Sequence, residues 1–292
     1  MLTSLALIFL AGLAMAALCS LLRLPRIIGM LFTGILLGPY VLELLDPSIL
    51  AISADLRQMA LIIILIKAGL SLDLGDLRRV GRPAVLMSFL PASFEILAYI
   101  LFAPMLLGIT RLEAAVMGAV LGISFLLVAA EDWLEGILPL SGLLAVMSMA
   151  CALRLWGVSS VTDRLSEKFG KLWIAAEVLL FVLVGAAVDI RYTLQAGAAA
   201  VVMILLALCV RAVGVLLALA GTRLDWKERL FCVIAYLPKA TVQAAIGSVP
   251  LAMGLPCGAL VLSVAVLAIL ITAPLGAIGI DSTCRRLLRP AD

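Results

Sequence analysis

Residues 236–247 read Tyr236-Leu237-Pro238-Lys239-Ala240-Thr241-Val242-Gln243-Ala244-Ala245-Ile246-Gly247, inside an apolar stretch long enough to cross a bilayer. Pro238 has no backbone N–H and clashes with the carbonyl one turn earlier, so an ordinary helix cannot run through it. In hydrocarbon, freed backbone groups are tolerated only where they face protein or a watery cavity. Lys239 adds a cost of about 2.5 to 3.5 kcal/mol at the centre of a spanning helix. A broken, charged helix at membrane depth indicates an ion or substrate site in a secondary transporter.

The composition predicts a polytopic membrane protein. Of the 292 residues, 65% are hydrophobic and 13% charged, and the mean hydropathy is +1.27. The net charge of +3 is small, and the basic residues lie in short loops, which is typical of orientation signals and not of nucleic-acid binding. The chain has no histidine, which excludes histidine metal sites and Ser-His-Asp triads. The six cysteines show no CxxC spacing and are interpreted as small hydrophobic residues.

About ten apolar segments are long enough to span a membrane. They follow one another through residues 1–292 without a soluble domain, so we expect a single transmembrane domain. The first, Met1 to Leu22, lacks the features of a cleaved signal. The segments are Leu2–Leu22, Ile27–Leu45, Gln58–Leu72, Pro83–Leu107, Leu112–Ala130, Ile137–Leu153, Leu172–Ile190, Ala196–Ala220, Leu230–Met253 and Ala259–Ile280.

The loop charges change their pattern part-way along the chain. Arginines follow the first and third segments, so the odd-numbered connections have the charge of cytoplasmic loops. After the sixth, eighth and tenth segments the even-numbered connections carry the basic residues instead. The change falls between Arg82 and Arg154, so either one segment there does not span the membrane or the chain lacks an odd number of spans.

Two isolated charges lie in the middle of apolar segments. Glu95 is central in the fourth segment and Arg211 in the eighth, and intramembrane charges normally pair. We expect these two residues to form a structural salt bridge, in preference to direct ion binding by either. Lys239 and Gln243 are four residues apart and share a face of any helix that continues past the break. We interpret them, with Pro238 and Thr241, as lining an ion pathway, in preference to a lysine that reaches out to the interface.

Lys67 and Glu177 are weaker candidates, and Glu131 and Asp132 are charges to which no site is assigned. Lys67 is near a segment end, so its ammonium is expected to reach the interface. Glu177 lies a little over a turn inside the seventh segment, where either an aqueous vestibule or an interfacial position is possible. Glu131 and Asp132 close an apolar run and point about 100° apart on a helix. They are interpreted as interfacial rather than as a paired carboxylate site.

Several stretches together resemble the monovalent cation:proton antiporter superfamily, in its branch of bacterial and animal sodium/proton antiporters. The stretches are Leu24–Gly29 with Gly34–Pro39, Lys67–Asp73, Leu237–Gly247 and Leu270–Gly276. They cover both ends of the chain, and the first (Leu24–Gly29 with Gly34–Pro39) and the third (Leu237–Gly247) are the most specific.

This resemblance implies an all-α membrane helix bundle with an inverted repeat and two broken helices that cross near the midplane. Leu230–Met253 resembles the second crossing helix, with Lys239 beside the crossing, and Glu95 and Arg211 resemble a buried acid–base pair. The resemblance also implies transported Na+ or Li+ and H+ without a cofactor, a homodimer in the lipid bilayer, no nucleic-acid partner, and the plasma (inner) membrane of a bacterium.

The chain also departs from the family pattern, because members carry a first crossing helix of the type Ser-Pro-Ala-Val-Val-Val-Pro followed by an Asp-Asp or Asn-Asp pair. Neither motif is present. Residues 112–121 begin like that crossing helix, whereas 122–127 resemble a later span. We therefore expect an incomplete fold with an internal deletion near Leu121, in which 1–121 resembles the N-terminal part and 122–292 the C-terminal part. An odd number of lost spans agrees with the change in loop charges.

Two functional hypotheses follow. In the first, the chain is a Na+/Li+:proton antiporter whose exchange is impaired because the cation-binding carboxylate motif is missing. In the second, it is a membrane protein without transport activity, either a remnant or an interaction module. An enzyme is not expected, because no nucleophile–base pair or metal cluster is visible in the sequence.

Overall fold

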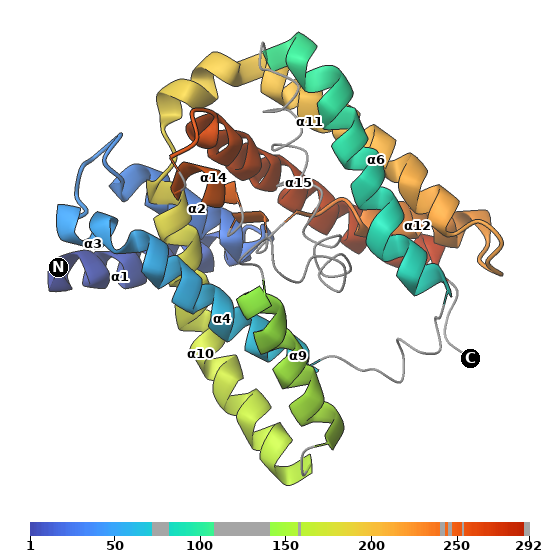
Figure 1. Cartoon of the computed structure of the whole chain (residues 1–292), viewed down its shortest axis with the longest axis horizontal. Helices are drawn as coiled ribbons and strands as arrows, with labels where there is room; N and C mark the ends of the chain where they lie inside the picture. The colour runs from blue at the N-terminus through green and yellow to red at the C-terminus, as the bar shows by residue number, and fades with distance from the viewer. Residues whose placement is uncertain are drawn as a thin grey trace.

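The computed structural model describes residues 1–71, 82–107, 141–156, 159–239, 243–244, 247–252 and 254–288. Every regular element in these residues is an α-helix, so the predicted all-α fold class is confirmed (Figure 1). The helices are α1 (Leu2–Leu21), α2 (Arg26–Leu37), α3 (Pro47–Ala51), α4 (Ser53–Ser71), α6 (Arg82–Leu107), α9 (Ser141–Trp156), α10 (Ser159–Ala186), α11 (Ile190–Ala218), α12 (Trp226–Ala235), α14 (Val249–Ala252) and α15 (Gly258–Leu287).

Five helices of this described part are long and apolar enough to cross a membrane, in α1, α6, α10, α11 and α15, and α2 is a shorter apolar helix. The fifth predicted segment and the start of the sixth lie outside the described residues. The total of about ten spans therefore stays a prediction.

Several helices differ in their limits from the predicted apolar segments, and the second and seventh segments differ most. The second segment was expected to continue to Leu45, but α2 ends at Leu37 because Gly38 turns to an extended backbone and Pro39 follows it. The seventh was expected to begin at Leu172, but α10 begins at Ser159. Its first turns are charged and exposed, so hydropathy does not detect them. They are helical in part because Glu167 and Lys171 pair at 2.9 Å four residues apart.

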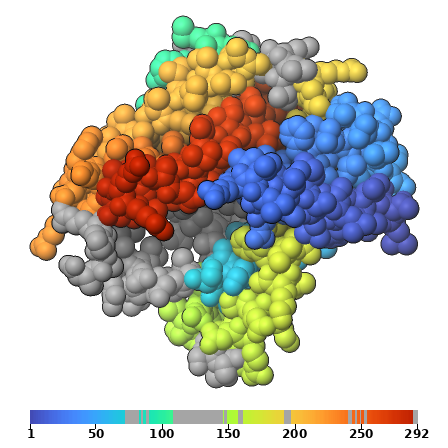
Figure 2. Space-filling model, turned by 180° about the vertical axis from the view of Figure 1, so that it is seen from behind, coloured from blue at the N-terminus to red at the C-terminus, as the bar shows by residue number. Residues whose placement is uncertain are grey.

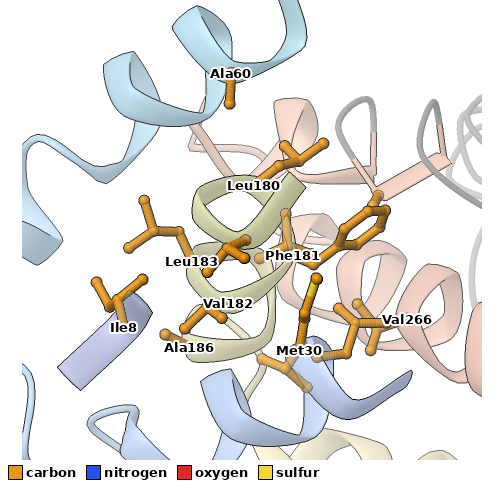
Figure 3. Packing of buried hydrophobic residues seen from close by; sticks show 14 of the residues in the cluster. Ile8, Met30, Ala60, Leu180, Phe181, Val182, Leu183, Ala186 and Val266 are labelled. Atoms are coloured by element: carbon orange, nitrogen blue, oxygen red, sulfur yellow. The ribbon is translucent and has the colours of Figure 1, made fainter. Parts of the chain in front are cut away.

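One hydrophobic core surrounds α10. Its residues Phe181, Val182 and Leu183 are at most 1% exposed and pack against Ile8 of α1 and Met30 of α2 (Figure 3). The backbones of α2 and α10 touch where two glycines meet. A Cβ on Gly34 would collide with the Val182 carbonyl, and one on Gly185 with the Leu31 carbonyl. Only glycine allows so close a crossing, which fixes α2 against α10.

A second core lies between α6, α11 and α15, and it contains Tyr99, Met203 and Val261. The helix α15 contributes residues to both cores, with Val266 in the first and Ala265 in the second. Seen from behind, α15 runs between α11 and the N-terminal helices (Figure 2). The described helices therefore form two packed groups joined by α15.

Candidate functional site: a buried ion cluster

The helix break predicted at Pro238 is present. The helix α12 ends at Ala235, and Leu237, Pro238 and Lys239 are not helical. The neighbouring helix α15 supplies a partner for the freed backbone, because the Lys239 N–H donates to Thr272 Oγ1 at 3.0 Å. The break is thus held against α15 within protein, as backbone at membrane depth requires. Thr241, the other end of the predicted break, lies outside the described residues.

Glu95 lies on α6 and is completely buried. Two cations bind its two oxygens, since Lys239 Nζ donates to Oε1 and Arg211 Nη1 donates to Oε2 at 2.7 Å. The Lys239 side chain is 1% exposed and that of Arg211 13%. The ion pair expected between Glu95 and Arg211 is therefore present, and Lys239 is bound to the same carboxylate.

A close contact between α6 and α11 brings Arg211 to Glu95. Gly214 follows Arg211 by three residues, and a Cβ there would lie 2.9 Å from the Leu90 carbonyl oxygen and from Pro91 Cα. Pro91 precedes Glu95 by four residues, so the close approach is within about one turn of both charges. The missing side chain at Gly214 lets the helices approach closely enough for a direct ion pair.

One tyrosine ring lies against the Arg211 guanidinium. The Tyr236 ring centroid lies 5.7 Å from Arg211 Cζ, a distance suited to a cation–π contact. The Tyr236 hydroxyl donates to the Met87 carbonyl oxygen at 3.3 Å, which ties the end of α12 to α6. Tyr99 is on α6 one turn after Glu95 and is fully buried. Tyr236, Thr272 and Tyr99 were not among the predicted site residues.

The cluster carries two positive charges and one negative charge. Its excess of positive charge disfavours a free cation nearby, and at an effective dielectric constant of 20 two like charges 4 Å apart repel by roughly 4 kcal/mol. In the part of the chain that the structure describes, no group of three acidic, cysteine or histidine side chains is placed to hold a metal ion. In the described residues, the Glu95 carboxylate is thus bound to two fixed cations, and no group of acidic side chains is placed to bind a transported cation.

The sodium/hydrogen exchanger transmembrane family model matches residues 5–131 and 121–286. The chain belongs to this family. The two matched segments overlap at residues 121–131, close to the expected junction near Leu121.

Curated relatives of this sodium/hydrogen exchanger family chain include human sodium/hydrogen exchanger 9B1, which is 40% identical over 118 residues, covering 37% of this chain and 22% of the relative. Sodium/hydrogen exchanger 9B2 of Bison bison bison is 35% identical over 182 residues, covering 59% and 34%. The chain thus spans about a fifth to a third of the length of these relatives.

The solved structure of the sodium proton antiporter MjNhaP1 from Methanocaldococcus jannaschii at pH 8 superposes with a TM-score of 0.80. The match has 17% sequence identity and covers 99% of each chain, so it shows a shared fold. Together with the apolar helices, the family and this fold show an integral membrane protein with an antiporter-type helix bundle, as predicted.

The other predicted site residues of this exchanger-family chain lie in separate places. Gln243 is buried beyond the helix break. Lys67 Nζ donates to Ser166 Oγ at 2.9 Å between α4 and α10. Glu177 on α10 is partly buried, with Trp173 of its own helix and Arg26 of α2 as its neighbours. Glu131 and Asp132 lie outside the described residues. The structure joins Lys239 to the ion pair of Glu95 and Arg211, whereas the sequence predicts the lysine and the ion pair as separate features.

Proposed function

We propose that this chain derives from the monovalent cation:proton antiporters and that its exchange of Na+ or Li+ for H+ is impaired. The observation that carries the proposal is that Lys239 and Arg211 both bind the Glu95 carboxylate. Coupled exchange needs a carboxylate near the midplane that alternates between holding a cation and holding a proton. A carboxylate fixed by two buried cations is not free to do this.

The sequence supports the same proposal. It contains no Asp-Asp or Asn-Asp pair, which family members use to bind the cation. The overlap of the two matched segments at 121–131 agrees with a junction between parts that are not adjacent in the family. A deletion there would remove the first crossing helix and leave the break at Pro238 without its crossing partner.

Proteoliposomes with an internal pH dye test this proposal. After a sodium or lithium pulse, we expect no cation-dependent change of internal pH above that of empty vesicles. An added ionophore that exchanges Na+ for H+ should still change the internal pH of the same vesicles, which shows that they are sealed and that the dye responds. Asp55→Asn serves as a charge-matched control at an exposed acidic residue. Robust exchange that survives Asp55→Asn but disappears with Glu95→Gln, or with a double change at Glu131 and Asp132, would overturn the proposal and identify the working carboxylate.

The second candidate is a membrane protein that has no transport role, such as a remnant or an interaction module. It is favoured by the absence of the Asp-Asp or Asn-Asp pair from the sequence. The resemblance further supports a homodimer in a bacterial plasma membrane, bound to lipid and to no nucleic acid. Blue-native electrophoresis before and after chemical cross-linking tests the dimer, and a band at the monomer mass alone would count against it.

A further inference from the structure

Exposed cations without a counter-charge gather where α12 begins and α15 ends, away from the buried ion cluster. They lie in the turn before α12, in the first turn of α12 and in the last turn of α15, and they are Arg223, Lys227, Arg285 and Arg286. Within the part of the chain that the structure describes, none of these four side chains forms an ion pair or a hydrogen bond. Other exposed cations are paired, such as Arg154 with Asp163 at 2.8 Å and Lys171 with Glu167 at 2.9 Å.

The packing of α12 against α15 brings these cations to one end of the molecule. The two helices run antiparallel, because Ile234 lies against Gly279, whereas Pro238 lies against Gly276. The first residue of α12 is eight residues before Ile234, and the last residue of α15 is eight residues after Gly279. Both helix ends therefore lie about 12 Å beyond this contact, on the same side of it. Accordingly, the red end of α15 lies beside the orange residues around α12 (Figure 2).

The carboxylates at this end do not neutralise the cations. Asp225 and Glu228 form the capping box of α12, in which Glu228 accepts the Asp225 N–H at 2.9 Å, and Asp281 on α15 is exposed. A fifth cation, Arg229, donates to two backbone carbonyls of the turn before α12, both at 3.0 Å. Five cations thus face three carboxylates among the described residues of this end. The helix dipole does not account for Lys227, because a cation in the first turn of a helix is unfavourable.

Exposed apolar side chains lie next to these cations, at the level where the membrane span ends. Trp226 is 67% exposed, and Leu230, one turn later on α12, is 42% exposed. On α15 the apolar run ends at Ile280, and Arg285 follows five residues, about 7.5 Å, later. The headgroup layer on each side of a bilayer is roughly 5–8 Å thick. Long side chains in a helix point toward its N-terminus, which for the end of α15 is back toward the bilayer.

We propose that this end of the molecule is a binding surface for anionic phospholipids. The four cations bind headgroup phosphates, and Trp226 and Leu230 pack against the carbon atoms next to the headgroup. A cation near the surface of an anionic membrane is attracted to it, and several cations with an exposed tryptophan form the combination that fits a charged lipid headgroup. The surface does not depend on the transport function, because it does not include the ion cluster. We call these six residues the basic surface.

The test is the quenching of Trp226 fluorescence by lipids that are brominated on their acyl chains, with the full chain reconstituted in bilayers. The part of the signal that Trp226→Phe removes belongs to Trp226, one of four tryptophans. Brominated phosphatidylglycerol should be favoured next to Trp226 over brominated phosphatidylcholine by roughly tenfold, which is within the roughly fivefold per cation expected at an anionic surface. Salt at about 1 M should remove most of this preference, because the Debye length falls to about 3 Å.

Two double variants divide the basic surface into halves. Arg285→Gln with Arg286→Gln should lower the preference by roughly threefold, and Arg223→Gln with Lys227→Gln should do the same. All four residues are exposed, so both variants should keep the thermal unfolding midpoint within about 2 °C of the unmodified chain. Arg285→Lys with Arg286→Lys should retain most of the preference, because the charges remain.

A matched control and a soluble competitor complete the test. Lys168→Gln with Arg191→Gln removes two exposed cations from α10 and α11 and should leave the preference at Trp226 unchanged. If inorganic phosphate removes the preference and chloride at the same ionic strength does not, the cations take free phosphate and the lipid assignment is overturned. Equal quenching by the two lipids in the unmodified chain, or a preference that survives both double variants, would overturn the basic surface as a site for anionic lipid.

Discussion

Replacing Glu95 by leucine should lower the free energy of unfolding by roughly 3–5 kcal/mol, the range seen when one partner of a buried ion pair is removed. The reason is that Lys239 and Arg211 both depend on this carboxylate, and both would keep a buried charge without a counter-charge. In detergent the loss should appear as a fall of roughly 10 °C in the thermal unfolding midpoint.

Removing all three charges is the informative comparison. The combined variant Glu95→Leu with Arg211→Met and Lys239→Met should be more stable than Glu95→Leu alone, since apolar residues of similar volume leave no stranded charge. Asp55→Asn, at an exposed carboxylate, should leave the midpoint within about 2 °C of the unmodified chain. Equal losses in the single and combined variants would show that the cluster stabilises the fold by packing and not by charge pairing.

The sequence predicts the membrane helices well because their signal is simple. A run of about 20 apolar residues has few alternatives in a bilayer, and α1 and α6 end within a residue of their predicted limits. The prediction fails for α10, whose charged first turns lie outside the hydrophobic signal. It also fails for α2, where a single glycine ends the helix inside an apolar run. In both cases the helix boundary depends on backbone geometry and exposure, which hydropathy does not measure.

Part of the ion cluster could also be predicted from the sequence. A lone carboxylate and a lone guanidinium in different spans have a strong reason to pair, so Glu95 and Arg211 could be matched without coordinates. The sequence did not show that Lys239 shares the same carboxylate, because that depends on how the broken helix lies across α15. Tyr236 and Thr272 were missed for a related reason. Thr272 is within a matched stretch and Tyr236 is two residues before Pro238, but a neutral hydroxyl at membrane depth has many possible partners.

A second large effect on stability is expected where the helix break at Pro238 packs against α15. Gly276 of α15 is buried against Pro238, and a Cβ built there would overlap the Cγ and Cδ atoms of the proline ring. The ring is rigid and joined to the backbone, so it cannot move aside as a flexible side chain would. Thr272, which accepts the Lys239 N–H, is one turn earlier on the same helix. Any shift of Pro238 therefore pulls Lys239 away from both Thr272 and Glu95.

Gly276→Ala should consequently destabilise the chain by about 1–3 kcal/mol, the usual cost of overpacking, even though alanine is the better helix former. It should also make Lys239 react with an amine-modifying reagent, detected by peptide mass spectrometry, from which the unmodified chain protects it. Gly279→Ala is the matched control on α15, since its Cβ would meet the Cγ2 methyl of Ile234 in α12, at 2.8 Å, and not the proline ring at the break. The β-branched Ile234 side chain is stiff, so some loss of stability is expected, but it should be smaller than that of Gly276→Ala and Lys239 should stay protected. If Gly276→Ala behaved like Gly279→Ala in both measurements, contact with Pro238 would not be what holds the broken helix against α15.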